Sequence, residues 1–273
     1  MGVGPDEFPG AAFKRGLPPE LAGDLLWTSP HNLVLHLLSE TGLVGASLIG
    51  AAVLLWLRGA WREFARIRDA SLWWLLACAG VELLHALLEY PLWYAHFLAI
   101  TALMMGVSTS AGIPMRPWIV RVAFGLSAIA GATLLALSLG AYLKFDLASP
   151  VAAGRSLAAD SEIARDRASL AELAQSLLAP RAETLLFLAF PLDESSLAEK
   201  IQVGSRVMRV WPASEVIVRQ AIFLALAERN EEARTLLAEG LRTFPARRQA
   251  FAEVIQSAPP LARATLQPLL LEK

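Results

Sequence analysis

The chain has 273 residues, of which 55% are hydrophobic and 18% are charged, and its mean hydropathy of +0.48 is too high for an ordinary soluble domain. The net charge of −1 provides no overall attraction to nucleic acid or to anionic lipid. The single cysteine, Cys78, excludes disulfide bonds within the chain and cysteine-based metal sites.

Residues 1–28 predict an irregular surface loop, because glycine and proline recur throughout them. They lack the apolar core of a signal peptide. A membrane protein that starts in this way resembles the end of a longer one. We therefore expect the chain to be the C-terminal portion of a larger protein.

A first membrane helix is predicted to start at Ser29 and Pro30, with Ser29 as its N-cap, and to end at Arg58. Gly42 and Gly45 are expected to bend this helix or to admit a close neighbour. Ionisable groups are costly inside lipid, so polar residues here are functional candidates. One side of the helix carries a stripe of polar residues at every fourth position: Asn32, His36 and Glu40.

Further apolar runs predict three more membrane helices, over 71–88, 92–107 and 118–143. Arginine-rich segments follow the first and third helices, and short basic loops lie on the cytoplasmic side. By alternation, the His31 end of the first helix, the turn around Glu89 and everything after Lys144 lie outside. Two polar stretches that are distant in sequence are thus predicted to meet at one membrane face.

The remainder predicts a linker of small residues at 145–164 and a helical domain at 165–273. Residues 221–245 have the small-residue pattern of a tetratricopeptide (TPR) unit, and prolines recur 32 and 33 residues apart, at Pro180, Pro212 and Pro245. The predicted fold is all-α: a loop over 1–32, about four membrane helices over 33–144, and a short TPR-like helical domain.

His31 is the main catalytic candidate. An imidazole titrates close to neutral pH and can act as a general base towards a hydroxyl, and the adjacent helix N-terminus can hold an anionic group such as a phosphate. An interfacial histidine that only satisfies a loop carbonyl is the alternative. Asn32 and Glu40 could orient His31 or neighbouring helices, and a buried interhelical hydrogen bond is at least as good an interpretation of Glu40.

Glu82 and His85 form an E-x-x-H pair, which is half of the pattern of a carboxylate-bridged dimetal site. The sequence has no second pair, so we expect no metal and no other cofactor. His85 and Glu89, four residues apart, are expected to face a polar cavity or each other.

Two motifs resemble the O-antigen ligase and polymerase superfamily. The motif Pro30-His31-Asn32, followed by Glu40 and preceded by the loop with Gly2-Val3-Gly4, is similar to its periplasmic-loop motif. Residues 85–97, with the sequence HALLEYPLWYAHF, resemble the signature of the pilin-type protein O-oligosaccharyltransferase branch, and residues 211–245 resemble its tail.

The resemblance implies a multi-pass glycosyltransferase of the bacterial inner membrane whose helical tail lies in the periplasm. It would transfer a glycan from an undecaprenyl-diphosphate carrier to an acceptor hydroxyl, either on a serine or threonine of a pilin or other exported protein, or on a lipid A core sugar. His31 would activate that hydroxyl. Asn32, Glu40, His85, Glu89 and Tyr90 are the expected supporting or substrate-binding residues in the membrane part.

Basic residues near the diphosphate are expected in this family, and Lys14 and Arg15 are the outward-facing cations near the site. They look insufficient for a whole donor site, so we expect that the chain alone could be inactive. A non-catalytic membrane scaffold, whose TPR-like tail recruits an exported partner, is the alternative function.

Overall fold

The computed structural model describes residues 1–16, 28–109, 115–152, 170–173 and 179–271. For residues 146–152 it describes the backbone only. Regular structure within these ranges is helical, as predicted. The chain forms two compact units, and each combines segments that are distant in sequence. The first unit holds residues 1–8 and 27–120, and the second holds residues 9–26 and 121–273.

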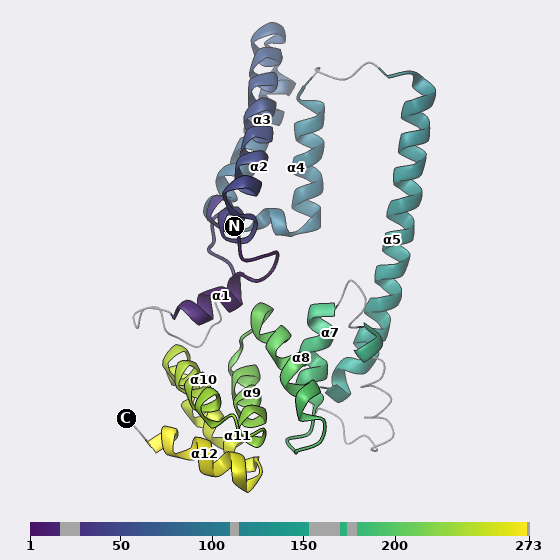
Figure 1. Ribbon diagram of the computed structural model, residues 1–273. Coiled ribbons are helices and arrows are strands. Elements are labelled where there is room, and N and C mark those ends of the chain that lie inside the picture. Colours follow the sequence, from purple (N-terminus) through teal and green to yellow (C-terminus); the bar gives the residue numbers. More distant parts are fainter. Residues whose placement is uncertain (17–27, 110–114, 153–169, 174–178, 272–273) are drawn as a thin grey trace. The chain divides into compact units, whose positions relative to one another are not determined.

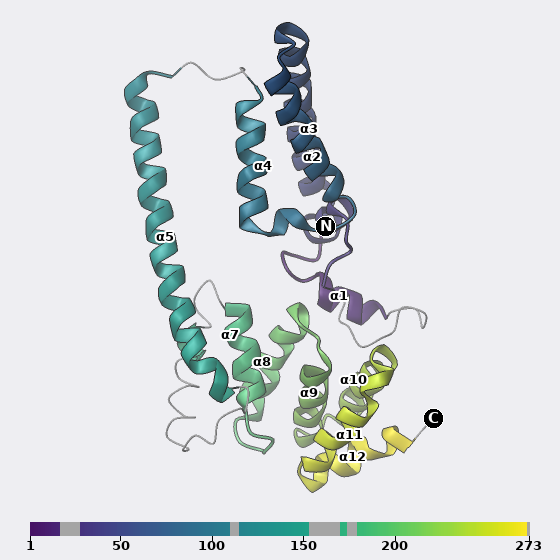
Figure 2. The same ribbon diagram turned by 180° about the vertical axis from the view of Figure 1, so that it is seen from behind.

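The first unit contains α2 (Leu33–Ile67), α3 (Ala70–His85), the 3-10 turn η2 (Pro91–Trp93) and α4 (Ala95–Val107). Helices α2, α3 and α4 lie side by side in both views (Figures 1 and 2). The indole nitrogen Nε1 of Trp56 on α2 donates to the carbonyl of Met105 at 3.0 Å and to Oγ of Ser108 at 3.1 Å. This side chain ties α2 to the end of α4.

Helix α2 differs from the prediction at both ends. Asn32, not Ser29, is the N-cap, because its side chain accepts a hydrogen bond from the Leu35 amide. At the other end α2 continues past Arg58 to Ile67, and Arg68 ends it in a left-handed conformation. Arginine is a good helix former, so the basic segment extends the helix and does not form a loop.

Gly42 bends α2, as expected. Its φ of 71° and ψ of −175° are not helical, so residues 33–41 and 43–67 are two helical segments with a break between them. These dihedral angles are accessible almost only to glycine. The break also leaves room for the chain start, since a Cβ atom on Gly42 would lie 2.6 Å from the backbone nitrogen of Gly2.

Within the described ranges, two helices are long and apolar enough to cross a membrane, judged by length and composition: Leu33–Ile67 and the part Pro117–Phe145 of α5 (Pro117–Ala152). Helices α3 and α4 are apolar but shorter. The end of α5 lies inside the stretch that was predicted as a linker, so helical structure extends further there than expected.

The second unit includes six helices at its C-terminal end, arranged in three consecutive pairs. The central helix is α9 (Ser214–Leu226), which is buried along most of its length and packs against the other five. These are α7 (Ala179–Ala189), α8 (Leu197–Val210), α10 (Asn230–Thr243), α11 (Arg248–Ser257) and α12 (Pro260–Leu271). The 3-10 turn η3 (Pro245–Arg247) precedes α11.

Helix α1 (Phe8–Arg15) lies within the segment that was predicted as an irregular loop. Its Pro9 is tolerated because the first turn of a helix does not need that amide. Phe13 is 4% exposed and belongs to the apolar core formed by α7 to α12. Helix α1 is therefore part of the second unit, although it precedes α2, α3 and α4 in the sequence.

Candidate functional site

The two polar stretches of the first unit meet through one side-chain contact. Nδ1 of His31 lies 2.7 Å from Oε2 of Glu89, which is 58 residues away in the sequence. The contact fits a neutral imidazole that donates from Nδ1 to the carboxylate, the tautomer in which Nε2 carries the lone pair. Both side chains are about half exposed, at 46% and 52%. The contact confirms that the two stretches come together.

The backbone around His31 holds the ring in this position. His31 has a φ of 50°, which is uncommon for a residue with a side chain, and its amide donates to Oγ of Ser29 at 3.1 Å. The ring of Tyr90 lies edge-on to the imidazole, with 5.1 Å between the centroids. Three neighbours thus restrict the imidazole: Ser29, Glu89 and Tyr90.

Asn32 joins the start of α2 to the segment after α3. Its Oδ1 caps the helix, and its Nδ2 donates to the carbonyl of Leu87 at 2.8 Å. The next amide, that of Leu33, donates to the carbonyl of Ala86 at 2.8 Å. Asn32 therefore links the residue after His31 to the segment that leads to Glu89, and its role in a functional site remains a prediction.

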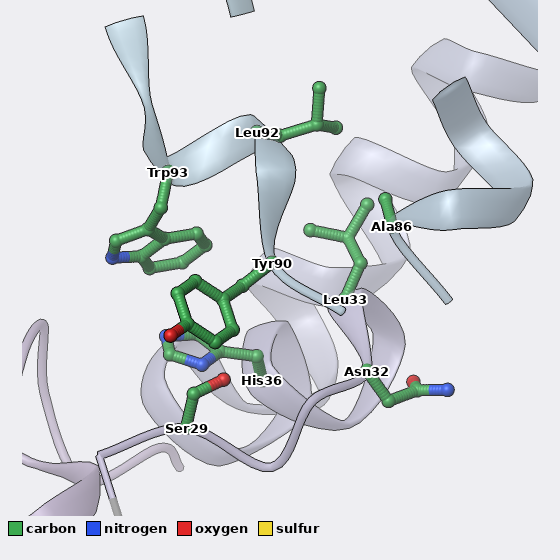
Figure 3. A pocket seen from close by; sticks show the side chains of 8 residues that line it. All are labelled: Ser29, Asn32, Leu33, His36, Ala86, Tyr90, Leu92 and Trp93. Carbon is green, nitrogen blue, oxygen red and sulfur yellow. The ribbon is translucent and has the colours of Figure 1, made fainter. Parts of the chain in front are cut away.

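A small pocket lies next to this junction (Figure 3). Its volume is about 10 Å³, which is room for about one water molecule and not for a sugar. The pocket therefore belongs to the support of the site, and a ligand as large as a sugar could reach His31 only from the exposed side of its ring. Its lining comes from both stretches: Ser29, Asn32, Leu33, His36, Ala86, Tyr90, Leu92 and Trp93.

His36 and Glu40 are buried one and two turns further along α2, at 5% and 9% exposure. Nε2 of His36 lies 3.1 Å from Oε1 of Glu40, and the same oxygen accepts from the Asp6 amide at 2.9 Å. The Trp93 ring packs edge-on against His36, with centroids 4.0 Å apart. Glu40 thus holds the segment before α1 onto α2, and the structure gives it no contact with His31.

The other predicted site residues lie apart from this contact. His85 is the last residue of α3, and its carbonyl accepts from the Glu89 amide at 2.8 Å, whereas the Glu89 carboxylate contacts His31. Lys14 and Arg15 are the exposed last residues of α1, in the second unit. Their proposed role towards a donor remains a prediction.

Three contributors were missed by the sequence reasoning. Ser29 was interpreted as a helix cap but accepts from the His31 amide, and Trp93, which was not predicted as a site residue, packs on His36. The backbone amide of Asp6 carries no sequence signal. The spacing of Ser29 and His31, two residues apart, was the only available signal, because Ser side chains commonly bond to nearby amides.

The profile of one protein family, described as "Virulence factor membrane-bound polymerase, C-terminal", matches residues 73–258 of the chain. This range includes Glu89 and most of the helical tail. It starts after His31.

A curated relative is also similar to part of the chain. It is a General O-oligosaccharyltransferase from Acinetobacter baylyi, 37% identical over 83 residues. The alignment covers 30% of this chain and 14% of that protein. No solved structure matches the chain.

Proposed function

The chain belongs to the family described as "Virulence factor membrane-bound polymerase, C-terminal", and we propose on this basis that it is the part of a glycosyltransferase that carries the general base. The reaction transfers a glycan from an undecaprenyl-diphosphate-linked donor to an acceptor hydroxyl at the periplasmic face of the bacterial inner membrane. The acceptor is a serine or threonine of a pilin-like or other exported protein, and the similarity to a General O-oligosaccharyltransferase supports transfer of an oligosaccharide to a hydroxyl oxygen. A lipid A core sugar is the other acceptor class.

The observation that carries this proposal is the hydrogen bond between His31 and Glu89. With Nδ1 donating to the carboxylate, Nε2 of His31 takes the proton of the acceptor hydroxyl as its oxygen attacks the anomeric carbon. The bond from that carbon to the diphosphate breaks, and the diphosphate leaves with the electron pair. Glu89 orients the ring and stabilises the imidazolium, as in other base and carboxylate pairs.

The proposed topology places four helices in the membrane: α2, α3, α4 and α5. It is supported by the two long apolar helices and by the membrane-bound family. Helices α3 and α4 form the shorter pair, with Glu89 in the connection between them on the periplasmic side. The tail after α5 is then periplasmic, and its three helix pairs are TPR-like, since the prolines 32 and 33 residues apart fall at the first helix of each pair.

The test is the substitution His31→Ala in membranes that contain the donor and an exported acceptor. We expect transfer of the glycan to fall to background while the amount of protein in the membrane stays the same. The matched control is His96→Ala, because His96 is an exposed histidine on α4. Transfer that survives His31→Ala would refute the assignment of His31 as the base.

A second candidate function, recruitment of an exported partner without catalysis, is favoured by a groove in the second unit. The groove has a volume of about 500 Å³, within the range of ligand pockets. Both apolar and hydrogen-bonding side chains line the groove: Lys14, Ile201, Ser205, Met208, Gln220, Leu224, Arg229, Glu231, Glu232, Thr235, Leu236 and Glu239.

A photo-cross-linking residue at position 235 of the full chain tests recruitment. Capture of an exported protein from position 235, but not from the exposed position Gln249 on α11, supports it. If the same capture persists with His31→Ala and no transfer activity is found in the unaltered protein, the scaffold function is favoured over catalysis.

A further inference from the structure

The last turns of α2 carry a row of arginines on one side of the helix. Arg58, Arg62 and Arg66 are exposed and follow each other at intervals of four residues, and Arg68 comes directly after the helix. Residues at this spacing lie above one another along a helix. The row therefore presents several guanidinium groups to the same surroundings.

The contacts of Trp56 determine which way this row faces. Trp56 is hydrogen-bonded to α4. Ala60, four residues later and on the same side of α2, is 1% exposed. At about 100° per residue, Arg58 lies about 200° around the helix from Trp56, and Arg62 about 240°. The arginines consequently point away from α4.

The acidic groups nearby are already engaged. Glu63 pairs with Arg66 through two hydrogen bonds, and the Asp69 carboxylate caps α3 by accepting from the Leu72 amide. In the described part of the chain, Arg58, Arg62 and Arg68 form no ion pair. The four arginines stand against two carboxylates, Glu63 and Asp69, so this end keeps a net charge of 4 − 2 = +2, and three of its guanidinium groups are outside ion pairs.

Large aromatic side chains surround the same end of the α2 and α3 hairpin. Trp61 is 69% exposed, and Trp73 and Trp74 are 53% and 65% exposed. Exposed tryptophans of this kind are typical of the headgroup region of a bilayer. Counted from Gly42, α2 rises about 24 Å to Arg58, about 30 Å to Arg62 and about 37 Å to its end, so the row of arginines spans the boundary of a ~30 Å hydrocarbon core and ends in the headgroup region.

We propose that Arg58, Arg62 and Arg68 form a binding surface for the phosphate headgroups of anionic phospholipids. Guanidinium groups match phosphate oxygens in charge and in geometry, the long side chains can extend along the helix to the headgroups, and the tryptophans hold this end at the correct depth. The inference goes beyond the proposed transfer reaction and uses from it only the placement of α2 in a membrane.

The experiment measures lipid selectivity in the full chain reconstituted into vesicles of phosphatidylcholine with spin-labelled phosphatidylglycerol or phosphatidylcholine as probe. We expect a preference of about fivefold for phosphatidylglycerol that weakens with salt. The triple variant R58Q/R62Q/R68Q is expected to bring the preference close to one. The variant R58K/R62K/R68K is expected to keep most of it, which separates loss of charge from loss of folding.

The matched control removes three exposed arginines of the second unit in R181Q/R242Q/R247Q, and we expect it to keep the preference. An unchanged preference in R58Q/R62Q/R68Q, or an equal loss in the control, overturns the proposal. Inorganic phosphate is compared with chloride at equal ionic strength. Displacement of the lipid probe by phosphate alone would assign the surface to a free anion and overturn the lipid assignment. None of these readouts depends on glycan transfer.

Discussion

Among single residues, His31 and Glu89 make the contact on which the proposed chemistry depends. The sequence predicted both in polar stretches at one membrane face, and it predicted that Glu89 and His85 face a polar cavity or each other. The structure pairs Glu89 with His31, because the short turn after α3 directs its carboxylate towards the start of α2. The i, i+4 pattern predicts neighbours only where a helix continues, and α3 ends at His85.

Replacement of Glu89 by glutamine tests the orienting role. Gln can still accept from Nδ1 but carries no charge to stabilise the imidazolium, so we expect kcat for transfer to fall about 10-fold to 100-fold with little change in KM. Initial rates over a range of acceptor concentrations check this. Glu199→Gln is the control, because Glu199 is exposed on α8. A rise in KM at unchanged kcat would contradict the prediction.

A second residue pair concerns stability alone. Lys200 is 1% exposed, and its Nζ donates to the Asp193 carboxylate at 2.6 Å and to the Pro191 carbonyl at 2.9 Å. The hydrogen bond from Lys200 to the Asp193 carboxylate, together with one from Ser195, lowers the pKa of Asp193 to about 2. A lowered pKa stabilises the folded state above the ordinary value of 3.8, and that contribution is lost as the pH falls towards 2.

We therefore expect Asp193→Asn to destabilise the helical tail at pH 5 to 6 and to become equivalent to the unaltered protein near pH 2. The difference is modest because Asp193 is half exposed. Hydrogen exchange of α8 amides in the full protein, corrected for the intrinsic rate at each pH, measures it. A difference that is the same at every pH would rule out the pair as its source.

Among the elements, α2 shows most clearly where the sequence was sufficient. Its apolar run, its polar stripe and the bend at Gly42 follow from residue types and spacing, and the structure has all three. Its end was misplaced because a row of arginines was interpreted as a loop, although arginine favours helices. Helix α1 was missed for another reason: Pro9 and Gly10 are residue types that usually break helices.

Gly42→Ala tests the break in α2. The φ of 71° is strained for alanine, and the new methyl group would lie 2.6 Å from the Gly2 nitrogen. We expect the free energy of unfolding to fall by about 1–3 kcal/mol. We also expect faster hydrogen exchange at Val3 and Gly4, whose amides donate to the carbonyls of Ser39 and Glu40. Gly50→Ala is the control, because a Cβ there meets nothing within 4 Å. Equal effects of the two substitutions would contradict the role of Gly42.

For the whole molecule, the two units are not consecutive parts of the chain. The predicted order of loop, membrane helices, linker and tail describes the sequence, but α1 packs in the core of the tail. Sequence patterns report which residues are apolar and how they repeat. They do not report that Phe13 of α1 belongs to the same core as α7 to α12, because that pairing is a matter of tertiary packing.

Removal of the Phe13 ring should therefore weaken a domain whose other helices start more than 160 residues later. We expect Phe13→Ala to cost about 3–5 kcal/mol in the tail and to raise hydrogen exchange in α8 and α9, measured in the full protein by mass spectrometry. Lys14→Ala, on the next and exposed residue, should leave exchange unchanged. Exchange that rises only within α1 would show that this helix is peripheral.

The position of α1 in the tail core also has a consequence for biosynthesis. About 190 residues separate Phe13 from Val203, its fellow member of that core, and a ribosome adds roughly 5–20 residues per second. Helix α1 thus waits on the order of 10 to 40 s, while the intervening apolar helices are synthesised, before the surface that buries it exists. Burial of the Phe13 ring is therefore a docking step that follows synthesis of the tail helices.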